Sequence, residues 1–279
     1  MSDTAKPSSD LTTRFAAAVV MIAVASAAIY IGGWLFRLLV VAASAIMLLE
    51  WGDMHRVKRT WSWIGAGLLG VVLLGATQWL YPAGEIDVIE GVEGVALETF
   101  DQLWLGFAAV AAAGFAYGLV TRRLSMGWGF LYVGIPAFAL LVIEWARFDL
   151  VFWLMLVTWS TDIFAYFAGR SIGGPKLAPR ISPNKTWAGL IGGMAGAAVV
   201  GAVAAWQFGL DPLFMIAGAP LGFLAQMGDL YESRVKRRLG VKDSGSLLPG
   251  HGGVLDRVDG LLPVVLATLL LLMLVLRSA

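Results

Sequence analysis

Long apolar stretches are the feature that most limits what this chain can fold into. A helix needs about 20 mostly apolar residues to cross a bilayer. Nine stretches of roughly this kind cover residues 15–33, 34–51, 63–81, 103–120, 128–146, 151–168, 188–206, 213–228 and 255–276. Only 14% of the residues are charged, against roughly 25% in an average soluble domain. The sequence therefore predicts an all-α, polytopic integral membrane protein with about nine transmembrane helices.

The domain organisation predicted from this pattern is simple. Residues 1–14 are polar and are expected to form a disordered cytoplasmic tail, and residues 15–279 one transmembrane domain without internal repeats. The first apolar stretch exceeds the 7–15 residues of a signal-peptide core, and no convincing cleavage site follows it, so we expect a retained first span. Pro220 and Gly222 interrupt the eighth stretch. Whether the first helical hairpin crosses the membrane fully stays open.

The distribution of basic residues predicts the orientation. Cytoplasmic loops of membrane proteins are enriched in Lys and Arg. If the N-terminus is cytoplasmic, 17 of the 20 Lys and Arg residues fall on the cytoplasmic side. The loop 82–102 contains no basic residue and six acidic ones, which places it outside. Nine spans with a cytoplasmic N-terminus and a periplasmic C-terminus satisfy the rule at every loop.

Cytoplasmic residues 161–187 form the first segment with candidate chemistry. Asp162 lies at the inner end of an apolar span, where an ionisable group is costly and usually functional. Three prolines and several glycines then prevent a regular helix in a basic segment that contains Ser182, Lys185 and Thr186. Such a loop can bind phosphates through backbone N–H groups and cationic side chains. The same composition also suits a loop beside anionic lipid headgroups.

Residues 226–260 form a more specific segment. If the eighth span continues as a helix, residues three and four apart share a face. That face carries Asp229, Glu232, Ser233, Lys236 and Arg237. Carboxylates suit Mg²⁺, and cations suit phosphate oxygens.

A polar, glycine-rich turn follows this stripe. Lys242 and Asp243 form an adjacent pair, and His251, Gly252 and Gly253 come shortly before the ninth span. Glycines let the backbone approach a ligand closely, and the start of a helix favours anions. A histidine on its own is more often structural, but the glycine-rich turn beside acidic residues favours a functional one.

Two aspartates begin the ninth span. Asp256 and Asp259 are three residues apart and therefore share a helix face, with Arg257 between them in the sequence. They could simply stabilise the start of the helix by interacting with its dipole. The basic and glycine residues around them indicate a functional site instead. Carboxylates for Mg²⁺, cations and backbone donors together favour phosphoryl or nucleotidyl transfer. A membrane setting implies that one substrate is a lipid.

Several motifs in these segments resemble those of a known family. Residues 233–259 contain S-x-x-K-R, K-D, P-G-H-G-G and D-R-x-D, and this stretch is similar to the defining motif of the phosphatidate cytidylyltransferases, or CDP-diacylglycerol synthases. Upstream, D-x-x-A-Y-x-x-G-R from Asp162 and S-P-N-K-T-W from Ser182 resemble further family blocks in the right order. The specific resemblance covers roughly the last 120 residues.

The resemblance implies that CTP and phosphatidate react to give CDP-diacylglycerol and pyrophosphate with Mg²⁺; a second, monovalent cation stays open. It also implies a homodimer in the bacterial inner (cytoplasmic) membrane, with no nucleic acid as partner. A transporter for a phosphorylated solute or ion is the alternative, because Glu50, Glu144 and Asp162 are intramembrane acids. Transporters often have repeats and midplane sites, which this sequence lacks. A CDP-alcohol phosphotransferase is excluded, because that class has the motif D-G-x-x-A-R, whereas Asp259-Gly260 is followed here by Leu-Leu-Pro.

Roles follow from this resemblance and from the charges, with the catalytic region in residues 160–260. The catalytic residues are predicted to be Lys242, Asp243, Asp256 and Asp259. The predicted metal ligands are Asp229, Asp256 and Asp259. The predicted substrate-binding residues are Ser182, Lys185, Thr186, Ser233, Lys236, Arg237, His251, Gly252, Gly253 and Arg257.

Overall fold

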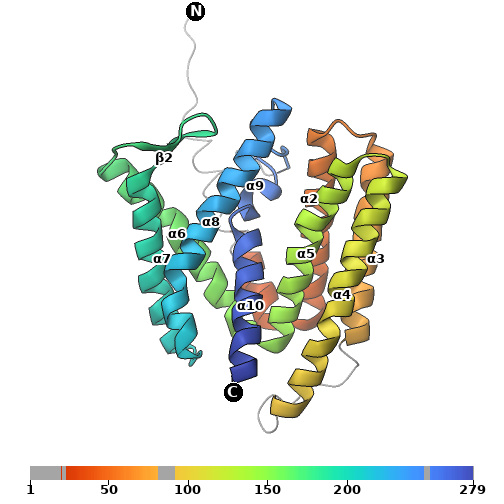
Figure 1. Cartoon of the computed structure of the whole chain (residues 1–279), viewed down its shortest axis with the longest axis horizontal. Helices are drawn as coiled ribbons and strands as arrows, with labels where there is room; N and C mark the ends of the chain where they lie inside the picture. The colour runs from red at the N-terminus through yellow and green to blue at the C-terminus, as the bar shows by residue number, and fades with distance from the viewer. Residues whose placement is uncertain (1–19, 21–22, 81–91, 248–251, 279) are drawn as a thin grey trace, which may run out of the picture.

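The protein is a bundle of long helices that run between two ends of the molecule (Figure 1). The computed structural model describes residues 20, 23–80, 92–247 and 252–278. The helices are α2 (Gly33–Met54), α3 (Arg59–Leu80), α4 (Val92–Val120), α5 (Leu124–Ala146), α6 (Phe148–Ser171), α7 (Trp187–Gln207), α8 (Pro212–Leu239), α9 (Leu255–Val258) and α10 (Leu261–Ser278). The strands are β1 (Lys176–Ala178) and β2 (Ser182–Thr186).

Seven helices of the described chain, α2 to α8, are long and apolar enough to cross a membrane, and α10 is a shorter apolar helix. The expectation of a polytopic helical membrane protein is therefore confirmed. The count of nine spans and the orientation remain predictions. The segments predicted to share the cytoplasmic side do lie at one end of the bundle: the β1–β2 hairpin, the end of α8 and the α2–α3 and α4–α5 turns are together at the top of Figure 1, and the C-terminus is at the bottom.

Helix α8 is continuous, although Pro220 and Gly222 suggested an interruption. It runs for 28 residues with Pro220 inside it. The side chain of Asp211 caps its start by accepting from the Leu213 N–H, and Gly240 ends it with a φ of 73°, a left-handed conformation that glycine adopts without strain. The apolar and charged halves therefore belong to one continuous helix, which is the condition under which Asp229, Glu232, Ser233, Lys236 and Arg237 were predicted to share a face.

Other boundaries differ from the prediction. Helix α4 begins at Val92, so the predicted outer loop 82–102 is too long. The predicted ninth span is divided into α9 and α10. Strands β1 and β2 form an antiparallel hairpin within the basic segment, a small exception to an all-α fold. The predicted tail, residues 1–14, lies outside the described residues.

The first predicted boundary, between residues 33 and 34, is matched closely. Residues 23–31 are helical, and α2 begins at Gly33. Gly32 and Gly33 have φ values of 65° and 56°. Positive φ values are unfavourable for other residues, so this glycine pair separates two helices.

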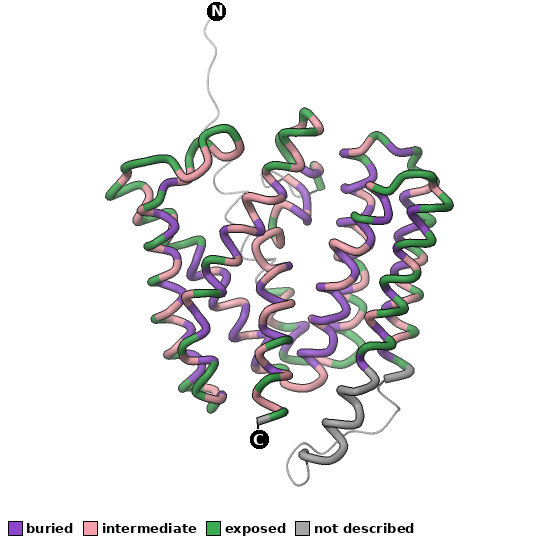
Figure 2. The backbone as a smooth tube through the Cα atoms, in the orientation of Figure 1, coloured by how far each residue is buried: buried purple, intermediate pink, exposed green. Residues whose placement is uncertain are grey.

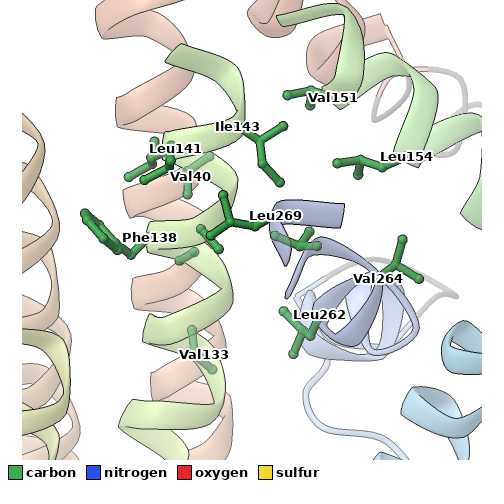
Figure 3. Close-up of a cluster of buried hydrophobic side chains, with 14 of the residues drawn as sticks. Val40, Val133, Phe138, Leu141, Ile143, Val151, Leu154, Leu262, Val264 and Leu269 are labelled. Carbon is green, nitrogen blue, oxygen red and sulfur yellow. The ribbon is translucent and has the colours of Figure 1, made fainter. Parts of the chain in front are cut away.

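The core lies where α2, α5, α6 and α10 meet. Helix α5 is the most enclosed of the long helices, and buried positions follow the inward faces of its neighbours in Figure 2. Figure 3 shows Val40 of α2, Leu141 of α5, Leu154 of α6 and Leu269 of α10 within one buried cluster. Helix α5 packs against both α2 and α10, and the end of α2 lies beside α9.

Candidate active site

The charged half of α8 provides one wall of the site. Ser233 Oγ donates to Asp229 Oδ1 at 3.2 Å, and Lys236 Nζ lies 2.9 Å from Glu232 Oε1, so successive turns are linked along one face. Glu232 is fully buried. The predicted stripe therefore exists, and its residues contact one another.

Asp256 at the start of α9 is held by its neighbours on all sides. It accepts hydrogen bonds from Lys236 Nζ at 2.6 Å, from Gly253 N–H at 2.8 Å, and from both the N–H and the Oγ of Ser244 at 2.9 Å. Burial alone raises the pKa of this carboxyl, but the hydrogen bonds from Lys236, Gly253 and Ser244 outweigh burial and lower the pKa to about 2. Asp256 is thus charged at neutral pH and anchors α8 to the segment before α9.

Asp259, one turn further along, has the opposite environment. A Cβ at Gly228 of α8 would collide with the Asp259 carbonyl oxygen, so glycine permits a close approach that brings Asp229 and Asp259 together. The Gly260 N–H donates to Asp259 Oδ1 at 2.7 Å. Burial first, and then the charge of Asp229, raise the pKa of Asp259 to about 7.

Asp162 joins these two aspartates. It lies within electrostatic range of both Asp229 and Asp259, and also of Lys185 and Arg257. Helix α6, helix α8 and the α9–α10 corner therefore each contribute one carboxylate to an acidic cluster, which we define as Asp162, Asp229 and Asp259. The sequence singled out Asp162 but gave it no role at the site.

The β1–β2 hairpin contributes a cation to this cluster. Lys185 Nζ of β2 lies 2.6 Å from Asp229 Oδ2 and donates to Gln226 Oε1 at 2.8 Å. Gln226 Nε2 in turn donates to Asp162 Oδ1 at 3.5 Å. Arg237 Nε donates to the Ile181 carbonyl at 3.4 Å, which attaches the hairpin to α8 a second time. The two predicted cytoplasmic segments thus form one site.

Other predicted binding residues have different surroundings. Thr186 is buried, and its Oγ1 accepts from Gly189 N–H at 3.0 Å as the N-cap of α7. Ser182 is half-buried in β2. Lys236 faces Glu232 and Asp256 rather than open solvent.

The remaining predicted residues lie around Asp256. Lys242, Asp243 and Arg257 are exposed. Gly252 has a φ of 81°, and a Cβ there would lie 2.6 Å from Asp256 Oδ2, so the turn requires glycine. Gly253 donates to Asp256 instead of presenting its N–H to solvent. His251 lies outside the described residues.

Glu50 is one of two residues near the site that were not predicted to belong to it. It was considered only as an intramembrane acid of the transporter alternative, but it is 6% exposed and contacts Ser244, Val254 and Leu255. Gln226 was also missed. An acidic residue in an apolar stretch was the available signal for Glu50, and a glutamine at the apolar-to-charged transition of α8 was the signal for Gln226.

The carboxylates fit a hard divalent cation. Among the described residues, no three acidic or histidine side chains converge to enclose a metal ion by themselves. Mg²⁺ is commonly held by one or two carboxylates together with substrate phosphates and water. Asp229 and Asp259 meet that requirement, because burial beside another carboxylate keeps Asp259 from ionising easily and a cation would relieve the repulsion.

A membrane-embedded helical bundle with carboxylates, cations and glycine turns at one end defines a class of protein: an integral membrane enzyme that handles phosphate groups at the membrane surface. Comparison with known proteins then narrows this class. The model of the cytidylyltransferase family matches residues 12–275. The chain belongs to this family.

Individual relatives agree with this assignment. The phosphatidate cytidylyltransferase of Brucella abortus is 39% identical over 274 residues, which cover 91% of this chain and 90% of that protein. That of Pseudomonas aeruginosa is 41% identical over 158 residues, covering 53% of this chain and 57% of its own length. That of Haemophilus influenzae is 42% identical over 124 residues, covering 42% and 43%. These matches favour the enzyme over the transporter.

Proposed function

We infer that this protein transfers the cytidylyl group of CTP to phosphatidate and releases pyrophosphate, which makes it an enzyme of phospholipid biosynthesis. The family match over residues 12–275 and the names of the relatives support this activity. The observation that carries it is the meeting of Asp229, Asp259 and Lys185, from three separate elements, at one end of the bundle.

The chemistry asks for positioning more than for proton transfer. A phosphate oxygen of phosphatidate attacks the α-phosphorus of CTP, a new P–O bond forms, the bond between the α-phosphorus and the bridging oxygen breaks, and pyrophosphate leaves. The attacking oxygen is already anionic at neutral pH, so a strong general base is not required. The protein lowers the barrier by alignment and by charge neutralisation.

Cations at the rim would bind the phosphates. Lys185 and Arg257 lie beside the acidic cluster, and Lys242 and Arg237 are exposed nearby on the same segment of chain. Exposed cations can move to a phosphate at little cost. Lys236 serves a different purpose, because it is held by Glu232 and Asp256 and keeps α8 and α9 together.

Asp229 and Asp259 are the residues that we propose hold Mg²⁺. When bound, Mg²⁺ would offset the negative charge of the triphosphate as the leaving pyrophosphate gains charge. The sequence also predicted Asp256 as a ligand. Its oxygens already accept from Lys236, Ser244 and Gly253, so we propose that it holds the site in shape instead.

An apolar cavity of about 200 Å³ lies beneath this site and offers space for an acyl chain. Phe36 and Met47 of α2, Leu140 of α5 and Leu262 of α10 are among its walls, and so is Val258, the residue that precedes Asp259 in the sequence. We propose that a phosphatidate tail occupies it while the phosphate reaches the acidic cluster. Met47→Trp should then raise the KM for long-chain phosphatidate more than for a short-chain analogue.

The membrane arrangement completes the proposal. We propose nine spans with the N-terminus in the cytoplasm and the C-terminus in the periplasm, in the bacterial inner membrane, and a homodimer as the working unit. The gathering of basic segments at one end of the bundle supports the orientation (Figure 1). In this orientation the site faces the compartment that contains CTP.

The direct test is pyrophosphate release by the purified protein in detergent, with phosphatidate, CTP and Mg²⁺ each left out in turn. Release that requires all three establishes cytidylyl transfer. Absence of release from folded protein, with several phosphatidate species tried, would contradict it.

A further inference from the structure

Glu50 is a buried carboxylate in a helix whose sequence carries none of the motifs that resemble the family. It lies one turn before the end of α2, at the same end of the bundle as the acidic cluster, and it is 6% exposed. A buried carboxylate is costly unless hydrogen bonds compensate it. Its contacts therefore indicate what the protein gains by placing it there.

Both carboxylate oxygens of Glu50 contact the segment that leads into α9. Oε1 accepts from Val254 N–H at 2.8 Å, and Oε2 accepts from Leu255 N–H at 2.9 Å and from Ser244 Oγ at 3.2 Å. The partners are about 200 residues away in sequence. Glu50 thus joins Ser244 to Val254 and Leu255, which are separate in the sequence.

Two glycines provide independent evidence that this contact is built into the fold. A Cβ at Gly245 would lie 2.8 Å from Glu50 Oε1, and a Cβ at Gly253 would lie 2.6 Å from the same oxygen. Distances below about 3 Å are not tolerated by real Cβ atoms, so any other residue would displace the carboxylate. Glycine at both positions therefore leaves room for the Glu50 carboxylate.

Glu50 is also connected to Asp256 through one shared residue. Ser244 Oγ lies 3.2 Å from Glu50 Oε2 and 2.9 Å from Asp256 Oδ2, while the Ser244 N–H donates to Asp256. We define residues 242–247 and 252–259 as the two flanks. They contain the exposed Lys242 and Asp243 on one side and Arg257 and Asp259 on the other.

We propose that Glu50 is a positioning residue of the transferase, which acts through Ser244 and the start of α9 to keep the two flanks in the form that receives the triphosphate of CTP. This rests on the proposed function. Glu50 itself is covered by the flanks and touches neither substrate. Its effect is to fix the distance between Lys242 of one flank and Asp259 of the other.

Substitution of Glu50 by glutamine tests this with little change in shape. An amide has one acceptor oxygen, so its NH₂ would face either Val254 N–H or Leu255 N–H. Glu144→Gln is the matched control, because Glu144 is also buried and accepts a backbone N–H, from Gly33 at 2.9 Å, at the opposite end of the bundle. Glu50→Asp keeps the charge with a shorter reach.

In steady-state assays we expect Glu50→Gln to raise the KM for CTP by about tenfold, with a much smaller change in the KM for phosphatidate. Glu50→Asp should recover part of this loss, and Glu144→Gln should leave both KM values unchanged. If Glu50→Gln leaves both KM values unchanged, as Glu144→Gln should, and lowers only kcat, then Glu50 is merely structural and the proposal is wrong.

Hydrogen exchange separates this proposal from the proposed function. In full-length wild type, the amides of Val254 and Leu255 should be protected and become more so with CTP and Mg²⁺. Glu50→Gln should remove that protection while leaving α5 and α7 unchanged, even if no transfer is detected. Equal protection in both proteins would overturn the positioning role, whereas failure of wild type to release pyrophosphate would overturn only the transferase assignment.

Discussion

The two ends of the short helix α9 carry the same kind of side chain in contrasting surroundings. Asp256 at its start accepts hydrogen bonds from Lys236, Ser244 and Gly253, and its pKa is lowered to about 2. Asp259 beyond its other end is partly buried near further carboxylates, and its pKa is raised to about 7. The difference supports the proposal that Asp256 holds the site in shape and that Asp259 is a ligand of Mg²⁺.

The largest effect is expected from Asp259→Asn. Loss of a cation ligand should reduce pyrophosphate release by on the order of 100-fold or more, while the fold persists because a repelled buried charge has been removed. Activity and thermal unfolding in detergent measure the two effects. Asp211→Asn, at the cap of α8 on the opposite end, is the control and should change neither.

Asp256→Asn should have the second largest effect and a different pattern. The amide NH₂ would face Lys236 or Gly253 N–H, so we expect roughly tenfold lower activity together with a lower unfolding temperature. A variant that is as stable as wild type yet inactive would show that Asp256 acts on the reacting groups directly.

The pH dependence of stability should distinguish the two aspartates further. Folding raises the pKa of Asp259 from 3.8 to about 7, so between these pH values the folded state holds a proton that the unfolded state releases. With a chelator present to remove divalent cations, Asp259 should therefore make the protein less stable as the pH rises from about 4 to 7. Asp256 has the opposite sign: the stability it contributes is lost as the pH falls from 3.8 towards 2. Unfolding temperatures of wild type and Asp259→Asn across pH 4 to 7 check the first slope, which the variant should lack.

The smallest effect is expected from Ser244→Ala. It removes the hydroxyl that Asp256 and Glu50 share, but the Ser244 N–H still donates to Asp256. We expect about 1 kcal/mol lower stability and a modest loss of activity. A loss as large as that of Asp256→Asn would show that the hydroxyl, and not the ion pair with Lys236, holds the anchor.

Many of the helices and charged residues could be predicted from the sequence, and the features that could not have identifiable physical reasons. Apolar length predicts the long helices, and the three- and four-residue spacing of Asp229, Ser233 and Lys236 predicts the face that they share. The position of Glu50 in an apolar stretch was a signal, but its role could not be predicted, because its partners lie about 200 residues away in the sequence. The contrast between Asp256 and Asp259 was equally hidden, because it depends on the close approach that Gly228 allows.

The Mg²⁺ dependence of pyrophosphate release tests the central contrast most directly. It should be measured for wild type, Asp256→Asn and Asp259→Asn with CTP and phosphatidate at saturation. We predict that Asp256→Asn reaches half-maximal rate at the same Mg²⁺ concentration as wild type, and that Asp259→Asn needs about tenfold more or cannot be saturated. A raised Mg²⁺ requirement in Asp256→Asn, equal to that of Asp259→Asn, would contradict the separation of anchor and cation ligand.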